Sequence, residues 1–300
     1  MTAVSTGPRR PLGGIVVGID PSPHSRQALD RAVRIPLQMG ASLDLIYAID
    51  EERYSAIVAH REGEARQLLD EARATAERFL PSAGLHDAVT SFAWGTPFAV
   101  IADRAHHGRA ELVVVGRHGE RRFRDLVIGS TAERVIRKGS VSVLVVATPP
   151  ETAYRRPLVA VDMSDSSRLA LELAARISDP KLDAIDVVHV IPMPSRPYVS
   201  GGELVPTLEG RRDEVERSVR EELLRFLGTV DAGVRWNLTV KFGDARAVIL
   251  EEAKQRNTDL LALGTKGRTG LARVFVGSVA EGVIRSAGCD VLVARRPKER

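Results

Sequence analysis

The chain contains two copies of one sequence pattern, and this internal repeat constrains its fold more than any other feature. An apolar run that ends in Asp, with Ser two residues later, opens the first copy as IVVGIDPS and the second as PLVAVDMS. This match aligns Asp20 with Asp162, and the later match of ELVVVGRHG with DLLALGTKG aligns Gly116 with Gly264. A repeat that spans most of 300 residues predicts two similar domains, because one core seldom grows beyond about 250 residues.

The domain limits follow from the ends of the two copies. We expect a flexible N-terminal arm over residues 1–11, a first domain over 12–150 and a second over 154–297, since the arm is small, polar and rich in Pro and Gly. The two Asp landmarks are 142 positions apart and the two Gly landmarks 148, so the second copy carries six extra residues. We place them in SRPYVSGGELVP, as a loop insertion.

Short runs of Val, Leu and Ile alternate with amphipathic helical stretches in both copies. The strands expected in the first copy are near 15–19, 43–48, 89–93, 111–115 and 142–147, with helices near 23–39, 60–80, 97–107 and 130–138. The strands expected in the second copy are near 157–162, 184–190, 233–240, 259–263 and 290–294. Runs without alternating polar residues are typical of parallel strands that are buried on both faces.

This alternation predicts an α/β fold of two tandem Rossmann-like, doubly wound domains. Each domain is expected to hold a five-stranded parallel sheet of order 3-2-1-4-5, with helices on both faces. The strand order reverses between the first and fourth strands, and ligands of such sheets bind at the carboxyl ends of the strands beside the reversal. The topology therefore predicts where a binding site lies before any motif is considered.

A glycine pattern occurs at this predicted edge in both copies. The glycines are Gly116, Gly119 and Gly129 in the first copy and Gly264, Gly267 and Gly277 in the second. A glycine after a strand lets the backbone turn sharply and approach a ligand, and the third glycine opens a helix whose free N–H groups attract phosphate. Ser130, Thr131 and Ser278 add hydroxyl donors, so we expect each loop to hold a polyphosphate.

The serines also have a purely structural interpretation. Ser130 with Glu133, and Ser278 with Glu281, have the spacing of a capping box, which starts a helix with no ligand present. One serine can serve both purposes, so the sequence leaves this alternative open.

Asp20 and Asp162 end the first strands on the other side of the same crevice. A carboxylate there can accept hydrogen bonds from a ribose or help to hold Mg²⁺ near phosphates. The alternative is that each Asp caps the helix that follows, together with Ser22 or Ser164. Their position at the reversal of strand order favours the binding role.

Both halves resemble the universal stress protein domain, in particular its ATP-binding branch. That branch carries Gly, two residues, Gly, nine residues, Gly and then Ser or Thr, a pattern that both loops match, and the resemblance extends from about residue 12 to 296. It implies that the Asp of the first strand contacts the nucleotide, that a small apolar residue late in the second strand lines the adenine, and that the glycine loop holds the phosphates and ribose. The residues so assigned are Asp20, Ala48, Gly116, Gly119, Gly129, Ser130 and Thr131, and Asp162, Val190, Gly264, Gly267, Gly277, Ser278 and Val279.

The resemblance implies an ATP-binding protein, with or without Mg²⁺, that acts in stress response or signalling as a nucleotide-dependent regulator. A slow ATP hydrolase and a scaffold with structural nucleotide are the alternatives, and we favour binding because no residue is placed as a general base. No GxxxxGK followed by Ser or Thr is present, and no GxGxxG follows the first strand, which argues against P-loop and Rossmann dehydrogenase chemistry. The first loop is the more charged, so we regard the second site as the firmer prediction.

Charge and composition bear on partners and location. The net charge is +4, but basic residues are interspersed with 39 acidic ones, which does not indicate nucleic-acid binding. No apolar stretch approaches the ~18 residues of a membrane span, and the single cysteine, Cys289, fits a reducing compartment, so we expect a cytoplasmic protein without membrane contact.

The apolar fifth strands, SVLVV and DVLVA, would be open edges. We expect them to pair within the chain as a pseudo-dimer; a homodimer and a protein partner stay open.

Overall fold

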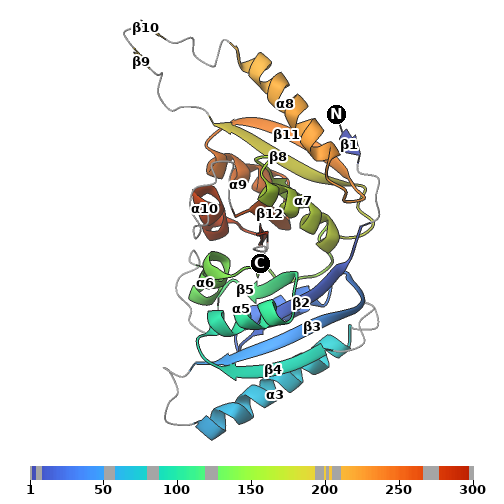
Figure 1. Cartoon of the computed structure of the whole chain (residues 1–300), viewed down its shortest axis with the longest axis vertical. Coiled ribbons are helices and arrows are strands. Elements are labelled where there is room, and N and C mark those ends of the chain that lie inside the picture. The colour runs from blue at the N-terminus through green and yellow to red at the C-terminus, as the bar shows by residue number, and fades with distance from the viewer. Residues whose placement is uncertain are drawn as a thin grey trace.

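Both halves of the chain contribute to one sheet (Figure 1). The computed structural model describes residues 2–4, 9–50, 58–79, 88–118, 128–192, 199–200, 203–204, 211–265 and 277–296. The sheet has 11 strands in the order β1-β11-β8-β7-β12-β13-β6-β5-β2-β3-β4. The chain therefore folds as two α/β units whose sheets are continuous with each other.

The described part of the first unit holds five parallel strands and four helices. Its strands are β2 (Leu12–Ile19), β3 (Leu37–Ile49), β4 (Ala88–Trp94), β5 (Leu112–Gly116) and β6 (Ser142–Val146). Its helices are α1 (Pro23–Ala32), α3 (Val58–Glu77), α5 (Pro97–His107) and α6 (Ser130–Lys138). Across the sheet the strands follow the order third, second, first, fourth, fifth, and neighbouring strands of the unit are parallel.

The second unit repeats this arrangement. Its strands are β7 (Pro157–Ala160), β8 (Ala184–Pro192), β11 (Arg235–Gly243), β12 (Leu260–Gly264) and β13 (Asp290–Ala294). Its helices are α7 (Asp165–Ile177), α8 (Arg212–Gly228), α9 (Ala245–Gln255) and α10 (Ser278–Ser286). The strand order is again third, second, first, fourth, fifth, with parallel neighbours. The fold class predicted from the repeat is confirmed.

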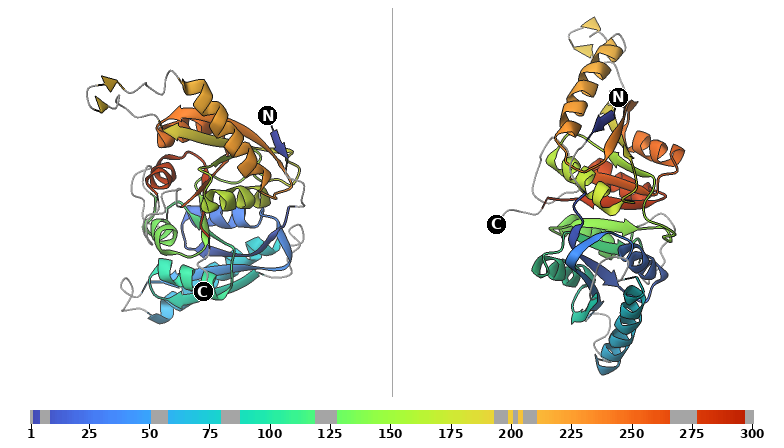
Figure 2. Two further views of the ribbon diagram at one scale, coloured as in Figure 1. Left: turned by 45° about the horizontal axis from the view of Figure 1, so that its top comes forward. Right: turned by 90° about the vertical axis from the view of Figure 1, so that its right-hand side faces the viewer.

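The two fifth strands join the units. Strand β13 pairs with β6 in antiparallel fashion, with Leu292 opposite Leu144 at the centre of the pairing. Two parallel sheets that meet through an antiparallel pair are related by an approximate twofold axis, as the views in Figures 1 and 2 show. The expectation that the fifth strands cover each other inside one chain is confirmed.

Each face of the sheet carries one apolar layer that runs through both units. One layer packs under α1, α3, α7 and α8 and includes Leu29 and Leu171; the other packs under α5, α6, α9 and α10 and includes Ile136 and Ile284. Because neither layer is interrupted at the junction, the two units share their core rather than meeting through a separate polar interface.

The first helix is shorter than its sequence pattern indicates. We expect a helix over residues 23–39, but α1 ends at Ala32 and strand β3 begins at Leu37. Pro36 accounts for the difference, because proline disfavours helical geometry at the residue before it and has no N–H to donate.

The N-terminal segment lies along the second unit. Residues 2–4 form strand β1 (Thr2–Val4), which pairs antiparallel with β11 and places Ala3 opposite Trp236. Further on, the Arg9 guanidinium donates to the carbonyl of Asp179 at 2.6 Å. Part of the segment that we expect to be loose is therefore paired, and it covers the edge of β11. The sequence gives no sign of this because residues 2–4 are too short to show a strand pattern.

The predicted insertion of the second copy falls largely on residues outside the described part. Within it, β9 (Val199–Ser200) and β10 (Glu203–Leu204) form a small antiparallel ladder. This ladder lies beyond the end of α8, away from the main sheet (Figure 1).

A buried carboxylate anchors the junction of the two units. Asp290 of β13 is fully buried, and its Oδ1 accepts hydrogen bonds from the backbone N–H groups of Ala147 and Thr148 at 2.9 and 3.1 Å. Its Oδ2 accepts from Arg31 Nε of α1 at 3.1 Å and from the Tyr154 hydroxyl at 2.6 Å. The network ties the first unit, the connecting segment and the second unit together at one point.

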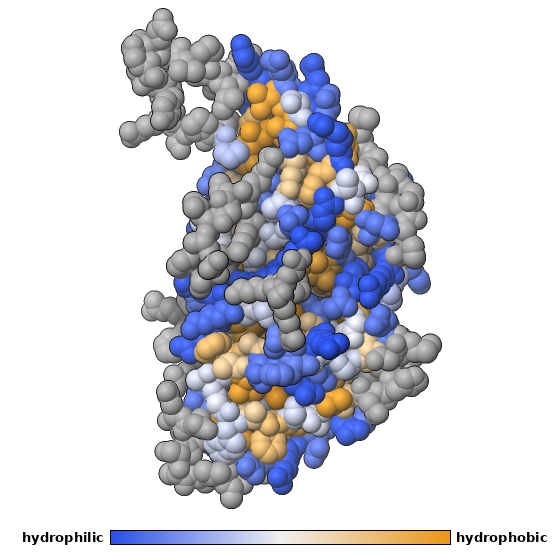
Figure 3. Space-filling view, in the orientation of Figure 1, coloured by the Kyte–Doolittle hydropathy of each residue, from blue (hydrophilic) through white to orange (hydrophobic). Residues whose placement is uncertain are grey.

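One face of the molecule is largely polar over both units. On the face shown in Figure 3, hydrophilic residues occur in both halves of the molecule, with smaller hydrophobic areas between them. Among the helices that the structure describes, none combines the length and apolar character needed to cross a membrane.

The first prediction concerns Asp290 and its counterpart Ser142, which accepts the Arg295 N–H at 3.1 Å. Asp290→Ala leaves the Arg31 guanidinium buried without its carboxylate, so we expect a loss of about 3 kcal/mol or more in the free energy of unfolding. Ser142→Ala removes a neutral hydroxyl and is expected to cost about 1 kcal/mol. Urea denaturation measures both, and equal losses would contradict the role given to the buried charge.

The second prediction concerns the alkaline limit of stability. Burial, followed by the negative charge of Asp290, raises the pKa of Cys289 from 9.0 to about 12. Above pH 9 the unfolded chain releases this proton and the folded chain keeps it, so stability falls as pH rises towards 12, by up to about 1.4 kcal/mol per pH unit from this group. Unfolding of Cys289→Ala should depend less steeply on pH over this range. An unchanged slope would contradict the assignment.

Candidate functional site

The strand register gathers the predicted residues of the first unit at one edge of its sheet. Ile19 of β2 lies opposite Tyr47 of β3, and on its other side β2 pairs with β5. Asp20 therefore follows β2 at the edge where β3 carries Ala48 and where β5 ends at Gly116. This edge is formed by the carboxyl ends of the strands at the reversal of strand order, as the topology predicts.

The second unit repeats the arrangement. Ala160 of β7 lies opposite Val188 of β8 and Leu263 of β12. Two residues further along the first two strands come Asp162 and Val190, and β12 ends at Gly264. The same three kinds of residue thus meet at the same edge in both units.

Each Asp shapes the turn into the following helix. In the second unit Asp162 Oδ1 accepts from the N–H and the hydroxyl of Ser164, at 3.0 and 2.5 Å, and in the first Asp20 Oδ1 accepts from the Ser22 N–H at 2.9 Å. Ser22 and Ser164 are the N-cap residues. Ser22 and Ser164 therefore cap the helices, as the structural alternative predicts. Each Asp instead forms an Asx turn just before the cap, by accepting from the N–H two residues later.

The third glycine of each motif begins a helix without a side-chain cap. Gly129 is the N-cap of α6 and Gly277 that of α10, and neither helix has a capping hydrogen bond from a side chain. Ser130 and Ser278 are already the first helical residues, so the capping boxes anticipated as an alternative do not form. Both hydroxyls lie on the exposed first turn, beside N–H groups that a helix leaves without internal partners.

The two ends of each loop are held together. The Gly129 N–H donates to the carbonyl of Arg117 at 2.7 Å, and the Gly277 N–H donates to that of Thr265 at 2.9 Å. These equivalent bonds bring the base of the loop after the fourth strand to the start of the next helix. Gly119 and Gly267 lie between these ends, outside the described residues.

The first glycine of each motif is required by packing. A Cβ on Gly116 would lie 2.6 Å from the carbonyl carbon of His24, and one on Gly264 would lie 2.8 Å from that of Ser166. Both distances are shorter than any ordinary contact, since β5 and β12 end directly against the first turns of α1 and α7. These glycines are therefore explained by the fold alone.

Gly277 differs from them. A Cβ there would meet only the Thr265 carbonyl oxygen among its described neighbours, at 3.6 Å, which is an ordinary contact. Its φ of −59° is accessible to any residue. Neither the backbone nor the described surroundings require glycine at this position.

The two sites are not identical. In the first unit the rings of His24 and His118 meet edge to face with centroids 5.1 Å apart, whereas Ser166 takes the place of His24 in the second. Within the part of the chain that the structure describes, no group of three or more His, Cys, Asp or Glu side chains is arranged to hold a metal ion. Mg²⁺ at Asp20 or Asp162 would therefore depend on phosphate oxygens and water for its other ligands.

Comparison with known proteins identifies the family. The profile of the universal stress protein family matches residues 13–147 and again residues 153–295. The chain belongs to the universal stress protein family. Universal stress protein E of Salmonella typhi is 25% identical over 300 residues, which cover 94% of this chain and 93% of that protein.

Two further relatives agree with this placement. A universal stress protein of Methanocaldococcus jannaschii is 33% identical over 154 residues, covering 50% of this chain and 86% of that one. The crystal structure of a universal stress protein from Archaeoglobus fulgidus covers 95% of this chain and 98% of its own, with a TM-score of 0.66 and 19% identity. At that identity the likeness shows the shared fold.

The glycine motif does not reveal the role of Arg117. This residue stands inside the first glycine loop, yet its guanidinium leaves the loop and donates to the carbonyl of Ala287 in the other unit at 2.6 Å. The available signal was a mismatch between the copies, since the second copy of this universal stress protein has Thr265 at the equivalent position.

The third prediction separates the two kinds of glycine. Gly264→Ala forces a Cβ against the first turn of α7, and we expect it to lower the free energy of unfolding by about 1–3 kcal/mol. Gly277→Ala has room and should cost about 1 kcal/mol or less, mainly through the helix cap. Urea denaturation of the two variants, side by side, is the measurement. A larger loss for Gly277→Ala would show that this glycine too is required by packing.

Proposed function

We propose that this universal stress protein binds ATP in each of its two domains and acts as a nucleotide-dependent regulator in stress response or signalling. The observation that carries the proposal is the duplicated edge, where Asp162, Val190 and the uncapped start of α10 meet in one unit and their counterparts meet in the other. An acid, a small apolar residue and a helix start thus lie together at the carboxyl edge of both units.

The residues present fit an adenine nucleotide. The N–H groups at the start of α10, together with the Ser278 hydroxyl, would hold phosphate at the positive end of the helix dipole. Gly277 leaves the space that close approach of a phosphate needs. Asp162 would accept a hydrogen bond from a ribose hydroxyl or hold Mg²⁺ through water, and Val190, which is 9% exposed, would contact the base.

Binding without turnover is the form of the proposal that we favour. Asp162 is the acid of the proposed site, and its Oδ1 is held by the N–H and the hydroxyl of Ser164. A carboxylate engaged in this way fixes a turn, whereas a general base has to be oriented towards the water that it activates. The protein would then report the presence of nucleotide by its bound state.

The fourth prediction tests the assignment at the second site. Asp162→Ala should weaken ATP binding at this site by about tenfold or more, the loss expected when one hydrogen bond to a charged group is removed. Asp165→Ala is the matched control, because Asp165 is an exposed acid on the first turn of the same helix that pairs with Arg296 at 3.0 Å. Isothermal titration calorimetry with ATP measures both.

Two outcomes would count against the proposal. Equal affinity of the Asp162→Ala and Asp165→Ala variants would remove Asp162 from the site. Sustained release of phosphate over many turnovers by the unaltered protein, abolished in Asp162→Ala, would replace the binding role with ATP hydrolysis.

A further inference from the structure

Two arginines cross the junction between the domains and end at the same kind of place. Arg117, from the first domain, donates to the carbonyls of Ala287 at 2.6 Å and Arg285 at 2.9 Å, at the C-terminal end of α10. Arg295, from the second domain, donates to the carbonyls of Gly139 at 2.9 Å and Ile136 at 2.7 Å, at the C-terminal end of α6. Each domain thus supplies a cation to the last turn of a helix in the other.

The two capped helices are those that begin at the candidate nucleotide sites. Helix α6 opens at Gly129 and α10 at Gly277, and each is only nine residues long. A cation at the C-terminal end of so short a helix favours the negative end of its dipole and fixes carbonyls that have no partner inside the helix. A shift of either helix along its axis would alter both the arginine contact at its C-terminal end and the proposed phosphate site at its N-terminal end.

The backbone of Arg117 lies at the base of the first glycine loop, and Arg295 follows the residue that bonds to the base of the second. The N–H of Arg117 donates to the carbonyl of Val146 at 2.8 Å, and its own carbonyl receives the N–H of Gly129, so Arg117 is the residue on which the first loop closes. In the second domain Thr265 holds the equivalent place at the base of the loop. Its N–H donates to the carbonyl of Ala294 at 3.0 Å, and Ala294 is the residue before Arg295 in the sequence. Each arginine therefore connects one loop to the helix of the opposite site.

These connections do not follow from the repeat. The counterpart of Arg117 in the second copy is Thr265, and the counterpart of Arg295 in the first copy is Ala147, neither of which has a cationic side chain. Both arginines are partly buried, and burial lowers the pKa of each guanidinium. Among the ion pairs of the described residues neither arginine has a carboxylate within salt-bridge distance, and each guanidinium is held by helix carbonyls.

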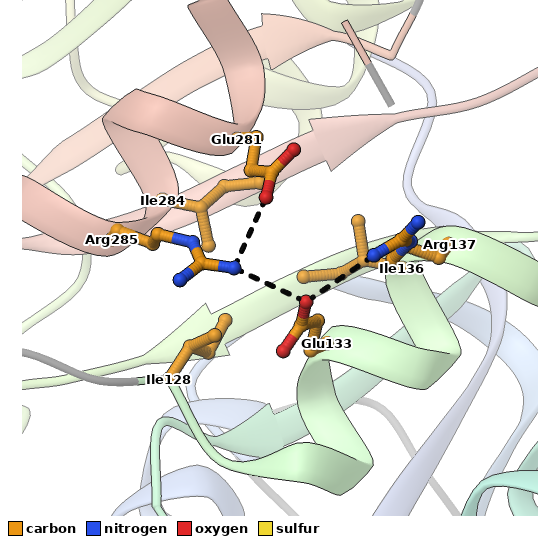
Figure 4. A pocket seen from close by; sticks show the side chains of 7 residues that line it. All are labelled: Ile128, Glu133, Ile136, Arg137, Glu281, Ile284 and Arg285. Atoms are coloured by element: carbon orange, nitrogen blue, oxygen red, sulfur yellow. Dashed lines mark hydrogen bonds and ion pairs between the residues drawn. The ribbon is translucent and has the colours of Figure 1, made fainter. Parts of the chain in front are cut away.

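The helices also touch each other directly. Glu133 of α6 accepts from Arg285 of α10 at 3.3 Å, and Arg285 is also paired with Glu281 at 3.0 Å (Figure 4). Ile136 and Ile284 line the small pocket between the two helices. The two helices are therefore linked by apolar side chains as well as by charge.

We propose that Arg117 and Arg295 couple the two nucleotide sites, so that occupancy of one changes the affinity of the other. The inference rests on the proposed function, since it concerns the regulation of the same sites. Coupling of this kind is reciprocal and typically changes affinity by about 5-fold to 150-fold. The two domains would then respond to nucleotide as one unit rather than as independent modules.

The fifth prediction has a readout that needs no nucleotide. Arg117→Thr and Arg295→Ala give each position the residue of the other copy. Hydrogen–deuterium exchange should rise in the last turn of α10 for Arg117→Thr and in the last turn of α6 for Arg295→Ala, in each case in the domain that does not carry the substitution. Unchanged exchange in the opposite domain would overturn the mechanical link.

The second readout is the coupling itself. The ATP affinity of the first site is measured by calorimetry in the intact protein at saturation of the second site, and again with Gly277→Val to block that site. We expect the two values to differ by about fivefold or more, and to agree within about twofold when Arg117→Thr and Arg295→Ala are both present. Arg246→Ala is the matched control, since Arg246 donates to Ser286 of α10 at 3.0 Å from within the same domain.

The outcomes separate the coupling from the proposed function. Two bound nucleotides whose affinities are independent, or a difference that persists in the double variant, would overturn the coupling and leave the binding role intact. Loss of coupling in Arg246→Ala as well would show that loosening α10 from any side suffices and would remove the special role of the crossing arginines. An intact protein that binds no ATP would contradict the proposed function. Hydrogen–deuterium exchange in the last turns of α6 and α10 would then be the test of the link between the domains.

Discussion

The antiparallel pairing of β6 with β13 is the constraint on which the rest of this structure depends. It turns two parallel sheets into one and places the two units on either side of an approximate twofold axis. A parallel sheet with an open apolar edge is prone to association with other chains, and here each edge is covered by the other. The apolar layers on both faces then continue across the junction, so the two units stabilise one another.

The two copies also differ at the junction. Asp290 and Ser142 occupy equivalent positions in the two copies. The Asp290 carboxylate is the centre of a buried hydrogen-bond network that includes Arg31, whereas the Ser142 hydroxyl bonds only to the backbone N–H and carbonyl of Arg295 among the described residues. An unpaired charge at this depth would be costly, so the network specifies how the units dock as well as holding them together. The crossing arginines extend the same asymmetry towards the candidate sites.

Much of the fold could be predicted from the sequence because each strand and helix carries its own periodicity and the repeat presents the evidence twice. The apolar runs that end in Asp, together with the predicted topology, placed Asp20 and Asp162 at the carboxyl edge of each sheet. The end of α1 was misjudged because the apolar periodicity continues past Pro36, although proline itself ends the helix. Contacts such as Arg31 with Asp290, 259 positions apart, could not be predicted because nothing in a single sequence relates residues across two folded units.

The central claim is that each universal stress protein domain of this chain holds one adenine nucleotide at the carboxyl edge of its sheet. The most direct test is native mass spectrometry of the intact protein after incubation with ATP, which counts bound molecules per chain. The account predicts two nucleotides per chain, and one in a chain carrying Gly277→Val. A protein that remains free of nucleotide at millimolar ATP would contradict it.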